Sequence, residues 1–484
     1  MKNQVQLITY VDRLGCKNLN DLKHLFQNQF KGLFGGLHIL PFYYPIDGED
    51  AGFDPINHEQ IDPRLGDWQD LKELSQEVDI MADLIVNHVS AQSIQFQDYL
   101  EKGNASKYAS LFLSFDTAFP NGATEADILA IYRPRPSLPF TMFKLSDGTS
   151  KLMWTTFTSN QIDIDVNSKM GQQYLESILA TFQKGGVKMI RLDAAGYAIK
   201  KQGTSCFMID ETFEFIDALA EKAKARNIEV LVEIHSYYKT QIEIAKRVDY
   251  VYDFALPVLV LDTLFNKNTT SLKKWLAVSP RNAISVLDTH DGIGIVDVAS
   301  ENGHAGLIED DVLDNIVNQM HLNSKGESLK ATGEAASNLD LYQVNCTYFD
   351  ALGRDEEAYL MARAIQFFVP GIPQVYYVGL FAGENDMELL AKTNVGRDIN
   401  RHYYTPEEIN TQLERPLIQK LKQLMLLRNN HPAFNGEFTL RESKESILHI
   451  EWRNDKDTAE LLIDLEAMKM DINYSERKEM SSVG

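Results

Sequence analysis

Short apolar runs rich in β-branched residues recur along the chain and alternate with stretches of helical periodicity. Amphipathic segments such as 174–184 and 212–226 place apolar side chains three or four positions apart. Buried strands that alternate with helices are typical of a parallel sheet. Eight such strand–helix units predict an α/β fold that closes into a (β/α)8 TIM barrel. The predicted strands cover residues 5–10, 36–40, 81–86, 187–192, 228–234, 250–255, 283–287 and 374–378.

The spacing of these runs is uneven. About a hundred residues separate the third from the fourth, which is more than one crossover helix needs, so an inserted domain is predicted at 88–168. A second insertion is predicted at 292–356, before the eighth strand. Apolar and polar positions alternate after Pro432 and predict a small antiparallel β-domain over 433–484. The barrel itself then consists of three parts, residues 1–87, 169–291 and 357–432.

Composition and charge narrow the range of partners. The net charge of -22 disfavours nucleic acid and anionic membrane surfaces. Cys16, Cys206 and Cys346 are far apart and odd in number, so we expect buried free thiols rather than disulfides or a zinc site. The first residues lack the apolar core of a signal peptide, and no apolar run reaches the ~20 residues that span a bilayer. We therefore expect a cytoplasmic protein.

Polar residues follow the apolar part of several predicted strands. Barrel enzymes place their catalytic groups at these carboxyl ends of the strands. A lone acid at one strand end would be interpreted as a helix cap, but coordinated acids with arginine or histidine partners at several ends predict an active site. The residues concerned are Asn87 and His88 after the third strand, Arg191 and Asp193 at the fourth, Glu233 and His235 at the fifth, and His290 and Asp291 at the seventh.

This set of residues suits the cleavage of a glycosidic bond. That reaction uses two carboxyl groups, one protonated to release the leaving group and one ionised to attack. Arg191 stands two residues before Asp193, on the same side of the strand, and is expected to keep Asp193 ionised as the nucleophile. Glu233 has no arginine beside it in the sequence, which suits a general acid/base with a raised pKa.

Four motifs at these positions resemble the α-amylase superfamily of retaining glycoside hydrolases. They are DLIVNH (83–88), IRLDAAGY (190–197), EIHS (233–236) and LDTHDGIG (287–294), in that family's order. Within it, the chain is similar to the sucrose phosphorylase family over nearly its whole length. The closer similarity lies in LPFYYPIDGEDAGFDPINH (40–58), IYRPRPSLPF (131–140), ASNLDLYQVN (336–345), PQVYYVGL (373–380) and GRDINRHYY (396–404).

The resemblance implies a role for each matching residue. Asp193 would take up a glucosyl group, Glu233 would act as acid/base, and Asp291 would be a third carboxylate that grips glucose hydroxyls. No cofactor and no metal are implied. Asn87 has the alternative of a calcium ligand, but without a cluster of further acids we expect it to make structural hydrogen bonds. The residues expected around glucose are Asp50, Phe53, His88, Phe157, Arg191, Tyr197, His290 and Arg397.

The acceptor side of the site decides whether water, a sugar or phosphate takes the glucosyl group. Phosphate needs local cations in so acidic a chain, and Arg133 and Arg135 in the segment RPRP could bind it, although this segment could also be a rigid solvated turn. We expect the phosphate and fructose site to consist of Tyr132, Arg135, His235, Asp340, Tyr342 and Gln343.

The resemblance therefore predicts reversible phosphorolysis of sucrose to α-glucose 1-phosphate and fructose, with sucrose and inorganic phosphate as substrates and a homodimer as the assembly. Three alternatives stay open. The first is a phosphorylase of sucrose 6-phosphate, glucosylglycerol or glucosylglycerate. The second is an α-glucan hydrolase or transglucosidase, which four tryptophans do not favour. The third is an inactive barrel that serves as a binding partner, although Asp193, Glu233 and Asp291 are all present.

Overall fold

The computed structural model describes residues 1–134, 137–301, 303–332 and 343–475 of the 484-residue chain. Parallel strands close into a barrel in the order β1-β16-β13-β12-β11-β10-β5-β2, which confirms the predicted fold. The strands are β1 (Gln6–Thr9), β2 (Gly36–Ile39), β5 (Asp79–Ile85), β10 (Val187–Asp193), β11 (Glu229–Val232), β12 (Tyr250–Asp253), β13 (Ala283–Ser285) and β16 (Ile372–Tyr376). All eight predicted strands are present. The eighth was predicted to extend to residue 378, but Tyr377–Leu380 forms the short helix α15.

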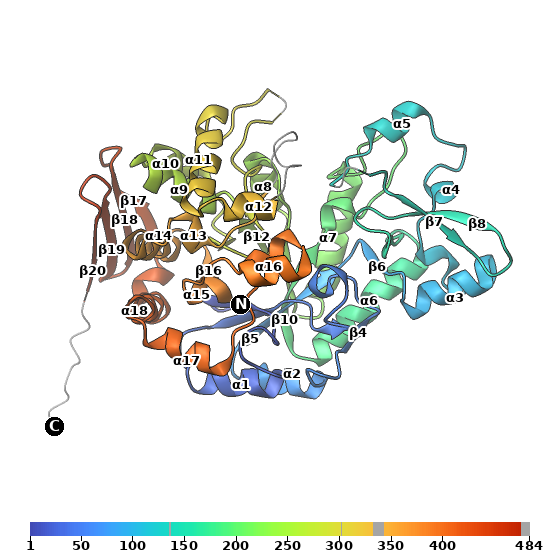
Figure 1. Ribbon diagram of the computed structural model, residues 1–484, viewed down its shortest axis with the longest axis horizontal. Helices are drawn as coiled ribbons and strands as arrows, with labels where there is room; N and C mark the ends of the chain where they lie inside the picture. The colour runs from blue at the N-terminus through green and yellow to red at the C-terminus, as the bar shows by residue number, and fades with distance from the viewer. Residues whose placement is uncertain (135–136, 302, 333–342, 476–484) are drawn as a thin grey trace.

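Helices cover the outside of the barrel (Figure 1). They are α1 (Leu19–Gln27), α2 (Trp68–Leu74), α6 (Lys169–Lys184), α7 (Asp210–Lys224), α8 (Tyr238–Ala245), α9 (Leu256–Asn266), α10 (Thr270–Val278), α14 (Glu356–Phe368) and α18 (Pro416–Asn430). Helix α6 illustrates why such segments form helices that pack on the barrel. The Ser168 side chain caps its first turn by accepting a hydrogen bond from Gly171 N–H. Its buried side chains, Leu175, Ile178, Leu179 and Phe182, follow the i, i+3, i+4, i+7 pattern of a helix with one apolar face.

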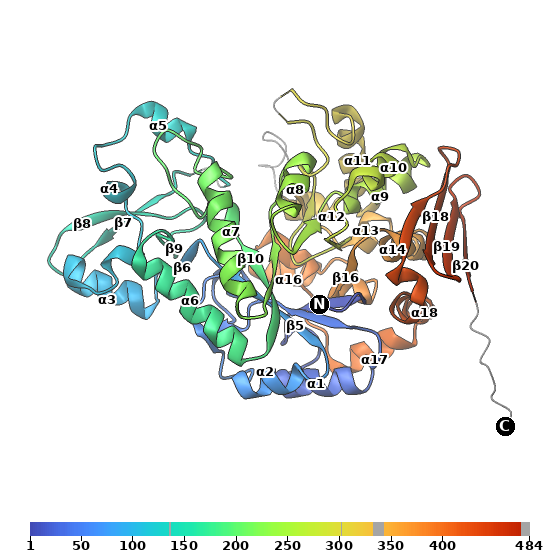
Figure 2. The same ribbon diagram turned by 180° about the vertical axis from the view of Figure 1, so that it is seen from behind.

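The chain between β5 and α6 forms a separate lobe beside the barrel (Figures 1 and 2). Its first and last strands, β6 and β9, pair antiparallel, so the lobe is closed at its base. A small apolar cluster that includes Phe119 and Trp154 fills its interior. Its elements are β6 (His88–Ser90), α3 (Ile94–Lys102), α4 (Phe115–Ala118), α5 (Glu125–Ala130), β7 (Phe140–Lys144), β8 (Ser150–Trp154) and β9 (Gln161–Asp163).

A four-stranded antiparallel sheet ends the described chain, on the opposite side of the barrel from this lobe (Figure 1). The predicted C-terminal β-domain is thereby confirmed. Trp452 anchors the sheet to the barrel, because its indole N–H donates to Phe368 O of α14 at 2.7 Å. The strands are β17 (Glu437–Leu440), β18 (Ile447–Asn454), β19 (Asp457–Asp464) and β20 (Lys469–Tyr474). The domain boundaries themselves stay predictions.

The remaining elements lie in the connections of the barrel. They are β3 (Tyr43–Tyr44), β4 (Asn57–Ile61), β14 (Ile293–Gly294), α11 (Asp310–Asn323), α12 (Glu327–Thr332), β15 (Gln343–Val344), α13 (Tyr348–Ala351), α16 (Met387–Thr393) and α17 (Pro406–Glu414). The three cysteines are buried and free, as predicted. Among the described residues, every helix is too short or too polar to cross a lipid bilayer.

A buried ion pair fixes the end of β13. Arg363 of α14 donates from Nη2 to both carboxylate oxygens of Asp288, at 2.8 and 2.9 Å, and both side chains are almost fully buried. Asp288 directly precedes Thr289, His290 and Asp291. This pair therefore supports a segment in which catalytic residues are predicted.

We expect Arg363→Met to lower the free energy of unfolding by about 3–5 kcal/mol, because it leaves the Asp288 carboxylate buried without its partner. Urea unfolding followed by tryptophan fluorescence measures the change. Lys246→Met is the control, since the Lys246–Glu243 pair is exposed and its loss should cost about 0.5 kcal/mol or less. Equal effects of the two substitutions would contradict the role of the buried pair.

Candidate active site

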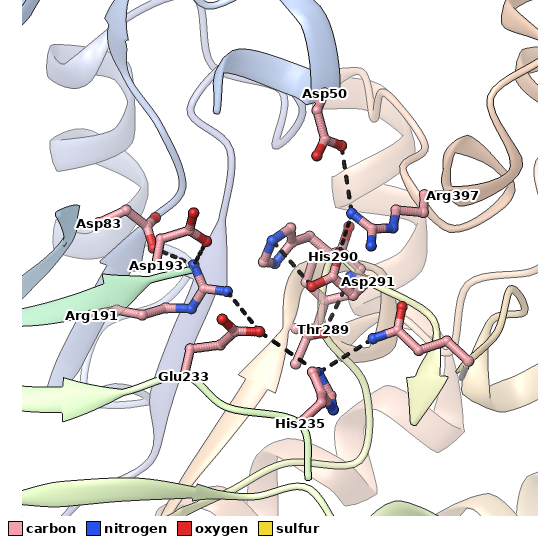
Figure 3. Close-up of polar contacts among 12 residues, drawn as sticks. Asp50, Asp83, Arg191, Asp193, Glu233, His235, Thr289, His290, Asp291 and Arg397 are labelled. Carbon is pink, nitrogen blue, oxygen red and sulfur yellow. Dashed lines mark hydrogen bonds and ion pairs between the residues drawn. The ribbon is translucent and has the colours of Figure 1, made fainter. Parts of the chain in front are cut away.

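Three carboxylates lie together at the carboxyl end of the barrel, each at or after the end of a barrel strand (Figure 3). Asp193 is the last residue of β10. Glu233 directly follows β11, and its N–H still donates to Leu192 O of the neighbouring strand at 3.3 Å. Asp291 lies between β13 and β14. Oxygens of Glu233 and Asp291 lie within 4.8 Å of each other and of a ring nitrogen of His235.

Arg191 links the two carboxylates that flank the predicted reaction centre. Its Nη1 donates to Asp193 Oδ1 at 2.9 Å and to Asp83 Oδ1 at 2.6 Å. Its Nη2 lies 3.8 Å from Glu233 Oε1. Sequence spacing had placed this arginine beside Asp193 alone. The structure places it against both carboxylates, because its guanidinium extends between the ends of β10 and β11.

Burial dominates the electrostatics of Asp193. It raises the pKa of this carboxyl well above its usual value; Arg191 opposes this, and Glu233, Asp83 and Asp291 add to it. Arg191 acts in the direction we expected and lowers this pKa, but burial outweighs it, so an Asp193 kept ionised by Arg191 stays a prediction. The neighbouring negative charges thus add to the cost of ionising Asp193, and Arg191 is the cation that opposes this cost.

A second arginine, Arg397, pairs with Asp291. Arg397, in the 3-10 helix η6 (Gly396–Asn400), lies with its Nη1 2.9 Å from Asp291 Oδ1 and 3.5 Å from Asp50 Oδ1. Burial disfavours the charge on Asp291, but Arg397, His290 and Arg401 outweigh it and hold the pKa of Asp291 well below its usual range. Asp50 has a left-handed backbone with φ of 50°, a strained conformation for a non-glycine residue.

Aromatic and imidazole rings line the same end of the barrel. Phe53 stacks on His290, with centroids 5.1 Å apart and planes 8° apart. His88 makes an edge contact with Phe157, which in turn contacts Tyr197. The imidazole of His88 also lies 3.0 Å from Phe53 O. The structure thus brings together all eight residues expected around glucose, namely Asp50, Phe53, His88, Phe157, Arg191, Tyr197, His290 and Arg397.

The structure describes only some of the residues predicted for the phosphate and fructose site. His235 Nε2 lies 3.8 Å from Glu233 Oε1 and 3.3 Å from the amide of Gln343. Tyr132 stacks on Phe207 at 4.5 Å and is 43% exposed. Arg133 is exposed. Three further predicted residues, Arg135, Asp340 and Tyr342, lie outside the described residues.

Several contacts that support the site could not be identified from motifs. Asp297 accepts from His235, and Arg401 Nε donates to His290 O. Lys200 Nζ donates to Asn87 Oδ1 at 2.8 Å and pairs with Asp163, so Asn87 makes the structural hydrogen bond expected of it. Only Asp297 carried a signal, as a single acid within the apolar run GIGIVDV.

Comparison with known proteins gives the family. The α-amylase catalytic domain model matches residues 32–377. The sucrose phosphorylase of Agrobacterium vitis is 58% identical over 98% of both chains, and that of Bifidobacterium adolescentis is 52% identical over 95% of this chain and 92% of its own. The crystal structure of sucrose 6F-phosphate phosphorylase from Thermoanaerobacter thermosaccharolyticum superimposes with a TM-score of 0.91 at 41% identity, covering 99% of this chain and 96% of the other. The chain therefore belongs to the α-amylase family and, within it, to the branch that contains the sucrose phosphorylases.

Proposed function

We propose that this enzyme catalyses the reversible phosphorolysis of sucrose to α-glucose 1-phosphate and fructose. The observation that carries the proposal is the asymmetric sharing of Arg191. Its hydrogen bond to Asp193 is 2.9 Å long, whereas Glu233 lies 3.8 Å away. The relatives that are more than half identical over nearly the whole chain support sucrose as the substrate.

In the first half of the reaction, Asp193 would be the nucleophile. The charge-assisted hydrogen bond from Arg191 stabilises the carboxylate form of Asp193, the form that attacks, against the burial that raises its pKa, and Glu233 is proposed as the proton donor. An oxygen of Asp193 attacks the anomeric carbon of the glucosyl unit as the bond to the fructosyl oxygen breaks. Glu233 gives its proton to that oxygen, and fructose leaves as a neutral sugar. A glucosyl ester of Asp193 results.

In the second half, phosphate would resolve this ester. A phosphate hydroxyl oxygen attacks the anomeric carbon and passes its proton to Glu233, while the bond to Asp193 breaks. Two displacements at one carbon retain its configuration. Contact of both carboxylates with one guanidinium favours the short carboxyl spacing of retaining enzymes.

The other predicted residues complete this proposal. Asp291, held ionised by Arg397, would grip glucose hydroxyls, and Phe53 and His290 would pack against the sugar. Tyr132, Arg135, His235, Asp340, Tyr342 and Gln343 are proposed for the phosphate and fructose side. We also propose a cytoplasmic location, which buried free cysteines suit, and a homodimer remains a prediction.

Sucrose with phosphate should release glucose 1-phosphate as the α-anomer, and sucrose alone should give only slow release of free glucose. An early proton NMR spectrum of the reaction measures both the product and its anomer. A parallel reaction with sucrose 6-phosphate serves as the comparison. Faster turnover of sucrose 6-phosphate than of sucrose would show that the phosphorylated sugar is the preferred substrate. Formation of the β-anomer would contradict a double displacement.

Asp193→Asn should abolish turnover while the fold is kept, because the amide cannot act as the nucleophile. The loss should be several orders of magnitude in kcat. Phosphorolysis rates measure the loss of turnover, and a thermal unfolding scan tests whether the fold is kept. Asp217→Asn on α7, where the carboxylate pairs with Arg247 at the surface, is the matched control and should keep full activity. Near-normal rates in Asp193→Asn would disprove the assignment.

Glu233→Gln should lose activity on sucrose but react with α-glucosyl fluoride, since fluoride leaves without needing a proton. The glucosyl-enzyme should then accumulate with neutral acceptors, and mass spectrometry of the quenched protein should show the added hexosyl mass. If α-glucosyl fluoride reacts no faster than sucrose in this variant, Glu233 is not the acid.

A further inference from the structure

Asp297 is a fully buried carboxylate just outside the reacting groups. It accepts three hydrogen bonds, from His235 Nδ1 at 2.9 Å, from Ser236 N–H at 3.2 Å and from Gln241 Nε2 at 2.7 Å. All three donors belong to the segment that follows β11, whereas Asp297 follows β14 in the connection between the seventh and eighth barrel strands. One carboxylate thus fastens that connection to the end of the strand that carries Glu233.

Gly294 makes room for this contact. A Cβ atom at Gly294 would lie 2.5 Å from Asp297 Oδ2, closer than real Cβ contacts allow, and 3.1 Å from His235 Nδ1, which is a tight contact. In β14, Gly294 pairs with Gln343 of β15, which brings the Gln343 side chain to the same imidazole. The glycine is therefore required by the close approach of Asp297 and His235.

These contacts leave one orientation for the imidazole. With Nδ1–H donating to Asp297, the Nε2 atom is directed to Glu233, 3.8 Å away, and to the Gln343 amide, whose nitrogen lies 3.3 Å from it. A protonated Nε2 requires this amide to turn over so that its oxygen accepts the Nε2–H bond. Phe254 stacks on the ring with centroids 3.8 Å apart and planes 14° apart, and so fixes its plane. A carboxylate that accepts from one ring nitrogen of a functional histidine commonly fixes its tautomer and the direction of the other nitrogen.

Among the described residues, three carboxylates act on the charge of His235, namely Asp297, Glu233 and Asp291. Burial disfavours the imidazolium, but these carboxylates outweigh it and raise the pKa of His235 above its usual value. Asp297 has the largest effect of the three. A cation facing the acceptor side compensates for the charge that phosphate brings beside Glu233 and Asp291.

We propose that Asp297 is a positioning residue that holds His235 as a cationic Nε2–H donor on the acceptor side, and thereby favours phosphate over water as acceptor of the glucosyl group. This inference rests on the proposed function. Asp297 itself does not contact the substrate. Its loss is expected to affect capture of the glucosyl group according to the charge of the acceptor. Water and neutral sugars gain little from the cation, whereas an anion gains a charge-assisted hydrogen bond.

Asp297→Asn should raise the phosphate concentration for half-saturation roughly ten- to a hundredfold, the usual effect of losing such a bond. Formation of the glucosyl-enzyme from α-glucosyl fluoride, and its hydrolysis without phosphate, should stay within about twofold of the wild-type rates. A phosphate titration at fixed sucrose, with glucose 1-phosphate and glucose followed separately, gives these values.

The pH profile supplies a second readout. The raised pKa keeps His235 charged as pH rises, and loss of the Asp297 charge lowers that pKa. The alkaline fall of kcat/KM for phosphate should therefore move to lower pH in Asp297→Asn. Phosphate itself titrates identically with both proteins, so the displacement between the two profiles reports the protein group.

Three further variants separate positioning from mere support of the fold. Gln241→Met is the matched control: it removes another donor to the same carboxylate but leaves the contact with His235, so it should keep the phosphate half-saturation. Gly294→Ala pushes Asp297 and His235 apart without removing a charge, and should reproduce the phosphate-specific loss if Asp297→Asn folds poorly. In a His235→Ala background, Asp297→Asn should have no further effect on phosphate.

Two results would overturn the proposal. One is an unchanged phosphate half-saturation in both Asp297→Asn and Gly294→Ala. The other is an equal loss with water, neutral sugars and phosphate, which would indicate structural support only. Both differ from failure of the proposed function, in which the wild-type enzyme itself would release no glucose 1-phosphate from sucrose and phosphate.

Discussion

The buried guanidinium of Arg191 is the interaction on which the site depends. It is 2% exposed and lies against the carboxylates of Asp83, Asp193 and Glu233. Asp83 also contacts His38 and, although burial opposes it, His38 and Arg191 lower its pKa to about 2. The positive charge of Arg191 is therefore largely balanced by Asp83 and cannot also neutralise Asp193 and Glu233. Burial and the neighbouring carboxylates consequently outweigh Arg191 and keep the pKa of Asp193 well above its usual value.

A second arginine, Arg397, holds the third carboxylate, Asp291, in its ionised form. Arg397 pairs with Asp291 and Asp50, and Nη2 of Arg401 lies 3.7 Å from Oδ1 of Asp50. Asp291 is thereby held ionised although it lies close to Glu233. The strained backbone of Asp50 persists because these ion pairs hold its side chain in place. Arg397 thus keeps Asp291 ionised, whereas Arg191 is shared by Asp83, Asp193 and Glu233.

The sequence allowed the barrel to be predicted because the strands are short apolar runs that alternate with helical stretches, and several of them have polar residues at the carboxyl end. The same rule located Asp193, Glu233 and Asp291 before any distance was known. It failed locally at the eighth strand, where β16 and α15 form one continuous apolar run, since both are buried and periodicity does not separate them.

Partners from distant segments could not be predicted in the same way. Lys200 resembles a solvated lysine beside Lys201, yet it is buried against Asp163 and Asn87. Phe207 carries no motif but stacks on Tyr132. The contact of Arg191 with Glu233 likewise depends on how the ends of β10 and β11 are staggered, which residue spacing along one strand does not encode.

The division of the site between strands and insertions explains how related enzymes can differ in acceptor. Asp193 and Glu233 stand at the ends of barrel strands β10 and β11, whose register is fixed by a closed sheet. Tyr132, Asp297 and Gln343 instead belong to the long connections after β5 and β13. Changes in these connections can alter charge and shape around the carboxylates without displacing Asp193 and Glu233. The sucrose 6F-phosphate phosphorylase shares this fold with a TM-score of 0.91. Under the proposed function, the barrel constrains glucosyl transfer and the inserted segments constrain the choice of acceptor.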